Sequence, residues 1–95
     1  MAHVFMFRFT SEGAKNISKI TELRKEGRQK TEELGGKIVA DYVLLGPRDV
    51  VYIVEGLDDK QAMAIAGFAA SSGLMTTETY VAIESAEALG VLTQT

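Results

Sequence analysis

The 95-residue sequence contains no cysteine and no tryptophan, and it has one proline and one histidine. The absence of cysteine excludes disulfides, thiolate metal sites and a cysteine nucleophile. The single histidine, His3, leaves too few nitrogen ligands for a histidine-based metal site. No glycine-rich phosphate-binding motif is present either, because neither G-x-G-x-x-G nor a glycine loop followed by Lys-Ser/Thr occurs. We therefore expect neither a metal nor a cofactor.

The sequence also lacks an excess of charge of one sign and a long hydrophobic run. Ten basic and thirteen acidic side chains give a net charge of −3, which disfavours nucleic acid as a partner. The longest uncharged stretch, residues 61–77, is too short and too rich in alanine, glycine, serine and threonine to span a bilayer. The N-terminal residues do not resemble a signal peptide. We expect no membrane association and a cytoplasmic location.

The remaining composition is that of one small globular domain spanning residues 1–95. Its order of hydrophobic patterns predicts six main elements. They are a strand at His3–Phe9, a helix at Asn16–Leu34, strands at Lys37–Leu45 and Val50–Val54, a helix at Ala62–Ala70 and a strand at Met75–Ile83. A short helix at Ala86–Leu89 and a loose tail at Val91–Thr95 follow.

Several residues mark where the helices start and end. Thr10 or Ser11 is suited to cap the first helix, and Asp58 with Gln61 forms a capping-box pattern before the second. Glycines predict the helix ends, at Gly35-Gly36 and at Gly73. Gly27 lies in the middle of the first helix, where it costs about 1 kcal/mol relative to alanine, so we expect a kink or a close contact there.

This β-α-β-β-α-β order predicts an α+β, ferredoxin-like fold, with two helices on one face of a four-stranded antiparallel sheet. The strands carry large apolar residues on both faces, as Val51, Tyr52 and Ile53 illustrate. An antiparallel sheet with one wet face normally alternates apolar with charged residues. We therefore expect the second face to be covered by another copy of the chain, in a homodimer or a larger homo-oligomer. The second helix is apolar nearly all round, so we expect it to contact protein on both sides.

The sequence resembles the GYD-domain family over residues 5–84. The resemblance rests on Leu34-Gly35-Gly36-Lys37, Tyr42, Gly46-Pro47-Arg48-Asp49, Val54-Glu55 and Thr77-Glu78-Thr79. The family takes its name from a Gly-x-Tyr-Asp turn, and Arg48 occupies the tyrosine position here. The resemblance implies a dimeric α+β barrel and an uncharacterised biochemical role. Within the turn, we expect Gly46 and Asp49 to be structural, with Asp49 accepting backbone N–H groups.

Five side chains are candidates for holding a small aromatic or anionic ligand on the sheet. They are Arg8, Tyr42, Tyr52, Glu78 and Tyr80. Aromatic walls would bury the ligand and Arg8 would orient its charge. In the alternative interpretation, Arg8 and Glu78 form a cross-strand ion pair and the tyrosines pack in an interface. His3 and Tyr42 are candidates for acid–base catalysis, and Arg8 with Glu78 is a second possible acid–base pair. The alternative for His3 is a partly exposed position at a sheet edge or rim.

Three functions remain compatible with these patterns. The first is an oligomeric, non-enzymatic module that binds a small ligand or regulates another protein. The second is a cofactor-free enzyme of the oxygenase or isomerase kind, a class that the resemblance implies through the wider superfamily of this family, with His3 or tyrosine as acid and base. The third is a structural assembly module that associates through the apolar helix at Ala62–Ala70. The sequence leaves open whether the protein is an enzyme.

Overall fold

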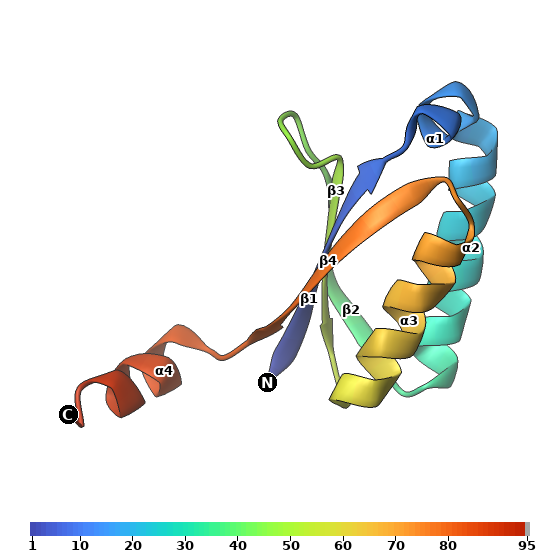
Figure 1. Cartoon of the computed structure of the whole chain (residues 1–95). Helices are drawn as coiled ribbons and strands as arrows, with labels where there is room; N and C mark the ends of the chain where they lie inside the picture. Colours follow the sequence, from blue (N-terminus) through green and yellow to red (C-terminus); the bar gives the residue numbers. More distant parts are fainter. Residues whose placement is uncertain (95) are drawn as a thin grey trace.

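The computed structural model describes residues 1–94 and has one four-stranded antiparallel sheet with α2 and α3 packed on one face (Figure 1). The elements are β1 (Ala2–Phe9), α1 (Ser11–Lys15), α2 (Ile17–Glu33), β2 (Lys37–Val43), β3 (Val50–Glu55), α3 (Asp59–Ser71), β4 (Met75–Ala82) and α4 (Ser85–Leu92). The α+β, ferredoxin-like fold predicted from the sequence is confirmed.

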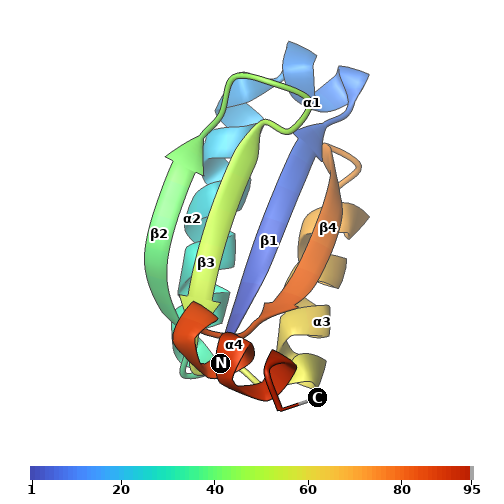
Figure 2. The ribbon, with the colours of Figure 1, turned by 90° about the vertical axis from the view of Figure 1, so that its left-hand side faces the viewer.

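The strand order is β2-β3-β1-β4, so the N-terminal strand lies inside the sheet (Figure 2). β1 pairs antiparallel with β3 on one side and with β4 on the other. β2 pairs with β3, and the register shifts between Ile38 and Ala40. Because side chains alternate between the two faces of a strand, these registers fix which residues face the helices.

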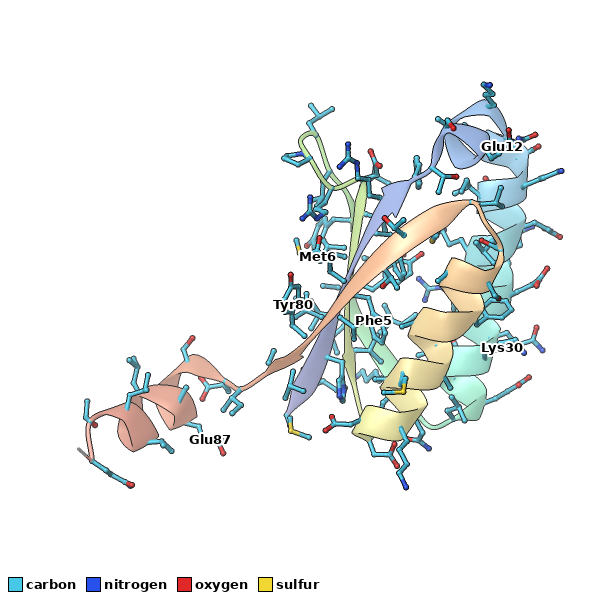
Figure 3. All side chains as sticks on the ribbon, viewed as in Figure 1. Phe5, Met6, Glu12, Lys30, Tyr80 and Glu87 are labelled. Atoms are coloured by element: carbon cyan, nitrogen blue, oxygen red, sulfur yellow. The ribbon has the colours of Figure 1, made fainter. Side chains whose placement is uncertain are left out.

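The core lies between the sheet and the helices. Phe5 and Val54 are the largest fully buried side chains, and Phe7 is 4% exposed. Phe5 points from β1 toward the helices, whereas its neighbour Met6 points to the opposite side (Figure 3). The buried hydrophobic cluster joins sheet and helices and consists of Phe5, Phe7, Ile20, Val50, Val54, Leu57, Ala62, Ile65, Ala69 and Met75.

The cap predicted at Asp58 and the helix ends predicted at Gly35 and Gly73 are confirmed. The Asp58 side chain accepts a hydrogen bond from the Gln61 backbone N–H at 2.7 Å, and the Gln61 side chain accepts one from the Asp58 backbone N–H at 3.0 Å. Gly35 follows α2 with a φ of 89°, and Gly73 follows α3 with a φ of 75°. Glycine adopts these left-handed conformations without the steric penalty that a Cβ brings.

The predicted helix at Asn16–Leu34 is confirmed as α2, but a short separate helix, α1, precedes it, and the sequence pattern did not reveal this helix. Thr10 caps α1 by accepting a hydrogen bond from the Gly13 N–H, and Asn16 then separates α1 from α2. Asn16 has a non-helical backbone, and its side-chain amide donates to the Glu12 carbonyl at 2.7 Å. Asparagine side chains compete for backbone hydrogen bonds in this way and favour helix interruptions.

The C-terminal segment also differs from the prediction. α4 continues through Leu92, so Val91 and Leu92 are helical rather than part of a loose tail; Thr95 lies outside the described residues. α4 projects as an arm from the body of the domain, at one end of the strands (Figures 1 and 2). The Cα radius of gyration is 14.4 Å, against about 12 Å for a compact domain of this length. Leu89 and Val91 on this arm are 59% and 60% exposed.

The second side of α3 is uncovered within a single chain. We expected this helix to contact protein on both sides, but Met63 is 74% exposed and Ala64 and Gly67 are exposed too. Contact on this side would need another chain, so that part of the expectation stays a prediction. Alanine and glycine expose little apolar surface each, so a helix rich in them tolerates water on one side.

Candidate functional site

The face of the sheet opposite the helices, here called the open face, carries large side chains from all four strands. The strand registers place these eight residues on it: Val4, Met6, Arg8, Tyr42, Val51, Ile53, Glu78 and Tyr80. Met6 and Tyr80 point away from the helices in Figure 3. Tyr42 and Tyr80 are 63% and 49% exposed. This face combines an apolar centre with a polar end.

Tyr52 does not join the other candidate ligand residues, so its predicted place in the site is wrong. It lies directly across from Phe5 in the sheet, and its ring meets the edge of Phe7 with 5.6 Å between centroids. Tyr52 therefore faces the helices, whereas Arg8, Tyr42, Glu78 and Tyr80 share the open face. Whether a residue of β3 faces the helices or the open face depends on the strand's alignment, and a shift of one residue exchanges the two faces. Both faces of β3 are apolar, so the sequence carried no signal that distinguishes them.

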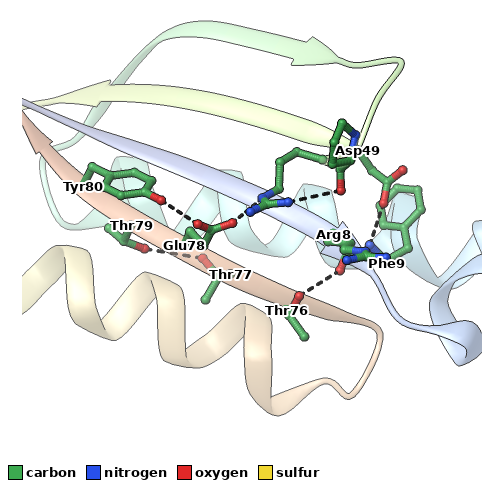
Figure 4. A network of polar contacts seen from close by, with 10 residues as sticks. Arg8, Phe9, Asp49, Thr76, Thr77, Glu78, Thr79 and Tyr80 are labelled. Atoms are coloured by element: carbon green, nitrogen blue, oxygen red, sulfur yellow. Dashed lines mark hydrogen bonds and ion pairs between the residues drawn. The ribbon is translucent and has the colours of Figure 1, made fainter.

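The polar end of the open face is organised around Glu78 of β4 (Figure 4). Its carboxylate accepts a hydrogen bond from the Arg48 side chain, and it accepts another from the Tyr80 hydroxyl at 2.5 Å. The bonds from Arg48 and then Tyr80 lower the pKa of Glu78 below its ordinary value. The same contact with Glu78 raises the pKa of Tyr80. Glu78 therefore stays ionised, and Tyr80 stays a hydrogen-bond donor, at neutral pH.

Arg8 lies beside this cluster without joining it. The predicted ion pair between Arg8 and Glu78 is wrong, because Arg8 lies across from Thr76 and Glu78 lies across from Met6. The Arg8 guanidinium has no ion pair or hydrogen bond among residues 1–94, although its backbone carbonyl accepts from Thr76. Arg8 and Arg48 both line a pocket of about 130 Å³ on the open face. Two guanidiniums against one carboxylate leave this pocket with one positive charge in excess.

Arg48 belongs to the site, although from the sequence we noted it only as a departure from the family turn. It follows Pro47 in the connection between β2 and β3, and its side chain reaches Glu78 on β4. β1 lies between β3 and β4 in the sheet, so this ion pair bridges across the central strand. The sequence did carry one signal for Arg48, because an arginine stands where the turn that names the family has a tyrosine.

The turn residues Gly46 and Asp49 have different structural roles. Gly46 has a φ of 148°, a conformation that disfavours other residues. The Asp49 carboxylate accepts a hydrogen bond from the Phe9 N–H at 2.8 Å, and the Asp49 N–H donates to the Phe7 carbonyl at 2.8 Å. Asp49 thus accepts a backbone N–H group, as predicted, and because the donor belongs to Phe9 it ties the turn to β1.

His3 lies under α3 and not at an exposed rim. It is 2% exposed, and its Nε2 is 2.8 Å from a carboxylate oxygen of Asp59 in the first turn of α3. Its Nδ1 is buried without a hydrogen-bond partner among the described residues. The histidine therefore ties β1 to α3 in this structure. Its role as an acid–base group stays a prediction, as does that of Tyr42.

Metal-ligating side chains do not gather anywhere in residues 1–94. No group of three or more histidine, aspartate or glutamate side chains in this range is arranged to hold a metal ion. None of the helices in the same range is long and apolar enough to cross a membrane.

Comparison with known proteins agrees with the resemblance noted in the sequence. The family model described as the GYD domain matches residues 3–92, nearly the whole chain. A protein of Thermus thermophilus, named glutamine synthetase and cystathionine beta-lyase binding protein, is 33% identical over 90 residues. That match covers 94% of this chain and 95% of the relative, so the two proteins align as whole domains.

Proposed function

The chain belongs to the GYD domain family, and from this premise we propose that it is a homodimeric protein-binding module that pairs through the open face of its sheet. The observation that carries the proposal is the apolar character of that face. Val4, Met6, Val51 and Ile53 are only partly buried in a single chain. A second copy packed sheet to sheet would remove these side chains from water, at about 25 cal/mol for each Å² of apolar surface.

The α4 arm supports pairing with a second copy. The arm leaves the end of β4 and lies in front of the open face, at one end of the strands (Figure 2). Its Leu89 and Val91 side chains are exposed. A groove of about 430 Å³ lies at the base of the arm, with Val39 and Ile53 among its apolar lining residues and Glu55 and Glu84 among its polar ones. In a two-fold dimer each arm would meet the partner's surface, because an isologous interface presents the same patches twice.

Binding to other proteins is supported by the relative, whose name describes it as binding glutamine synthetase and cystathionine beta-lyase. The two chains match over nearly their full lengths, so a shared mode of protein binding is compatible with the shared domain. A dimer would present each binding surface twice, which raises avidity for an oligomeric enzyme without any new contact. We propose enzymes of these two classes, from the same organism as this chain, as its partners.

Matched charge substitutions test the dimer. We expect wild-type protein to sediment as a dimer at micromolar concentration, and Tyr42→Glu to sediment as a folded monomer because the glutamate would be buried in the interface. Met63→Glu makes a similar change on the exposed side of α3 and should leave the dimer intact. A wild-type monomer would overturn the proposal. Dissociation by Met63→Glu with none by Tyr42→Glu would instead support assembly through α3.

Direct binding to purified enzymes tests the proposal that this chain binds other proteins. Glutamine synthetase and cystathionine beta-lyase from the same organism would be immobilised in turn and exposed to this chain, with an unrelated enzyme of similar charge as the control. We expect saturable binding to at least one of the two and none to the control. Equal binding to all three, or to none, would contradict the proposal even if the dimer forms.

We also propose that the pocket beside Arg8 holds a small anion. Its support is the uncompensated positive charge of Arg8 and Arg48 around Glu78. Aromatic carboxylates should raise the melting temperature of the wild-type protein by more than the matched uncharged amides do, since a ligand that binds the folded state stabilises it. Arg8→Ala should abolish this difference. Retention of the full shift in Arg8→Ala would remove Arg8 from the site.

A further inference from the structure

A cavity lies on the other side of the sheet, between β1, β3, α2 and α3. It offers about 50 Å³ of space for water-sized molecules. Its walls include Phe5 and Val54 from the sheet, Leu23 from α2, and Ile65 and Phe68 from α3. The polar side chain of Thr31 also lines it, but the Thr31 hydroxyl already donates to the Gly27 carbonyl at 2.8 Å. The interior of the cavity therefore suits an alkyl group.

Gly27 is the feature that keeps this space open. It lies in the middle of α2 and is not among the glycines with positive φ, so its backbone conformation does not require glycine. A Cβ built there would meet only one neighbour, a ring carbon of Phe68 at 3.9 Å, which is ordinary van der Waals contact. Alanine would fit and would favour the helix by about 1 kcal/mol. Glycine thus leaves room on the cavity side at a cost in helix stability.

The rim of the cavity is cationic. Arg24 and Arg28 project from α2, and both donate to the same carboxylate oxygen of Asp41 on β2. Each guanidinium has five N–H donors, so several remain available to a second carboxylate. The side chains of Arg24 and Arg28 are 50% and 42% exposed, which leaves them within reach of a ligand from solvent.

The phenol of Tyr52 completes the rim. Tyr52 lines the cavity from β3, and burial, followed by the nearby charge of Asp41, raises its pKa. Its hydroxyl therefore keeps its proton at neutral pH and can donate a hydrogen bond. A buried apolar space with a few convergent polar groups at its mouth is the common form of a small-molecule site.

We propose that this cavity binds a short-chain aliphatic monocarboxylic acid, with the alkyl chain beside Gly27 and the carboxylate held by Arg24 and Arg28. The volume limits the ligand, because an apolar cavity of roughly 150 Å³ is needed to hold benzene. A cavity of 50 Å³, about a third of that volume, excludes an aromatic ring and accepts about two carbon atoms, so the last carbons of a short chain would lie inside and its carboxylate end would lie at the rim. The site is separate from the open face and does not depend on dimer formation.

Butyrate is the probe for the test, with acetate, butanol and sodium chloride at equal concentration as controls. Binding would be followed by titration of backbone amide chemical shifts and by melting temperature. We expect saturable shifts around residues 24–31 with butyrate, smaller ones with acetate because its chain is shorter, and none there with butanol. Butanol equal to butyrate would overturn the proposal, because the arginines would then have no role.

Four variants separate this site from its alternatives. Arg24→Gln should weaken butyrate binding about tenfold or more, since a charge-assisted hydrogen bond is lost. Asp41→Asn should strengthen it, because the competing carboxylate is removed. Gly27→Ala should weaken it by filling the cavity, whereas Gly67→Ala, at a helical glycine with nothing within 4 Å, should leave it unchanged. Arg8→Gln should also leave it unchanged.

Three results would overturn the assignment. Unchanged affinity in Gly27→Ala would place the alkyl chain elsewhere. Weaker binding in Asp41→Asn would show that Asp41 positions the arginines for the ligand, contrary to the competition proposed. Loss of butyrate binding in Arg8→Gln would transfer the site to the open face. Failure of the dimer experiments above would leave each of these measurements interpretable, because they concern the interior of one chain.

Discussion

The two faces of the sheet are built from the same strands but differ in how completely they are packed. On the face toward the helices, Phe5 is 0% and Val54 is 1% exposed. On the open face, the adjacent residues Met6 and Ile53 are only partly buried, and Tyr42 is 63% exposed. The comparison shows that one chain supplies the helices to cover a single face and leaves the other face uncovered.

Alanine substitutions at two adjacent residues of β1, one on each face of the sheet, test this difference in packing most directly. We expect Phe5→Ala to lower the free energy of unfolding by about 3–5 kcal/mol, because it leaves a cavity among fully buried neighbours. Met6→Ala, one residue away on the open face, should cost about 1 kcal/mol in the single chain. Urea unfolding at the lowest workable protein concentration would measure both, since the proposed dimer would add a concentration-dependent term to the free energy of unfolding. Equal costs for the two variants would contradict the difference in packing.

Substitutions at two glycines, one at a packed position and one at an exposed position, test the same difference in packing with smaller expected changes in stability. A Cβ on Gly13 in α1 would lie 2.0 Å from the backbone carbonyl oxygen of Leu74, so Gly13→Ala must displace the backbone. We expect a loss of about 1–3 kcal/mol in the free energy of unfolding. Gly67→Ala on the exposed side of α3 meets no such contact and should gain up to about 1 kcal/mol from helix propensity. Thermal melts that show both variants shifting in the same direction would contradict this prediction.

The smallest expected change in stability is electrostatic and comes from Glu78, at the polar end of the open face. Hydrogen bonds from Arg48 and then Tyr80 lower the pKa of Glu78 below its ordinary value of 4.5. The folded state therefore gains stability from ionised Glu78 above that pH and loses it as the pH falls through the lowered pKa. We expect wild-type protein to melt slightly above Glu78→Gln at neutral pH, and the difference to shrink in acid.

Salt provides the control for that measurement. The side chains of Arg48 and Glu78 are 35% and 41% exposed, so added salt should screen their attraction and reduce the difference at neutral pH. A difference that grows as the pH falls would mean that protonated Glu78 is the form that stabilises the fold. Such a result would contradict the assigned ion pair.

The fold could be predicted from the sequence because its start and stop signals are local. The cap at Asp58, the turn at Gly46-Pro47 and the glycines after each helix are all read from a few adjacent residues, and the β-α-β-β-α-β order follows from them. The break at Asn16 was missed because asparagine also occurs inside helices. Its effect depends on a hydrogen bond to Glu12 that only the folded chain defines.

The site was predicted less well because it depends on strand frames and long-range contacts. Arg8, Tyr42, Glu78 and Tyr80 were placed on one face correctly, but Tyr52 was assigned to that face because β3 is apolar on both sides. The partner of Glu78 is 30 residues away at Arg48, in a turn whose reach across β1 no periodic pattern encodes. His3 shows the same limit, because its burial comes from α3, which lies 56 residues further along at Asp59.

The interior position of β1 has a consequence for how the chain folds during synthesis. β1 is made first, yet one of its two edges pairs with β4, which is the last strand to be made. Until residues 75–82 have left the ribosome, that edge exposes unpaired backbone groups beside Phe5 and Phe7. Such an edge is a template for pairing with another chain. We therefore expect nascent chains that stall before β4 to be the form of this protein most prone to aggregate.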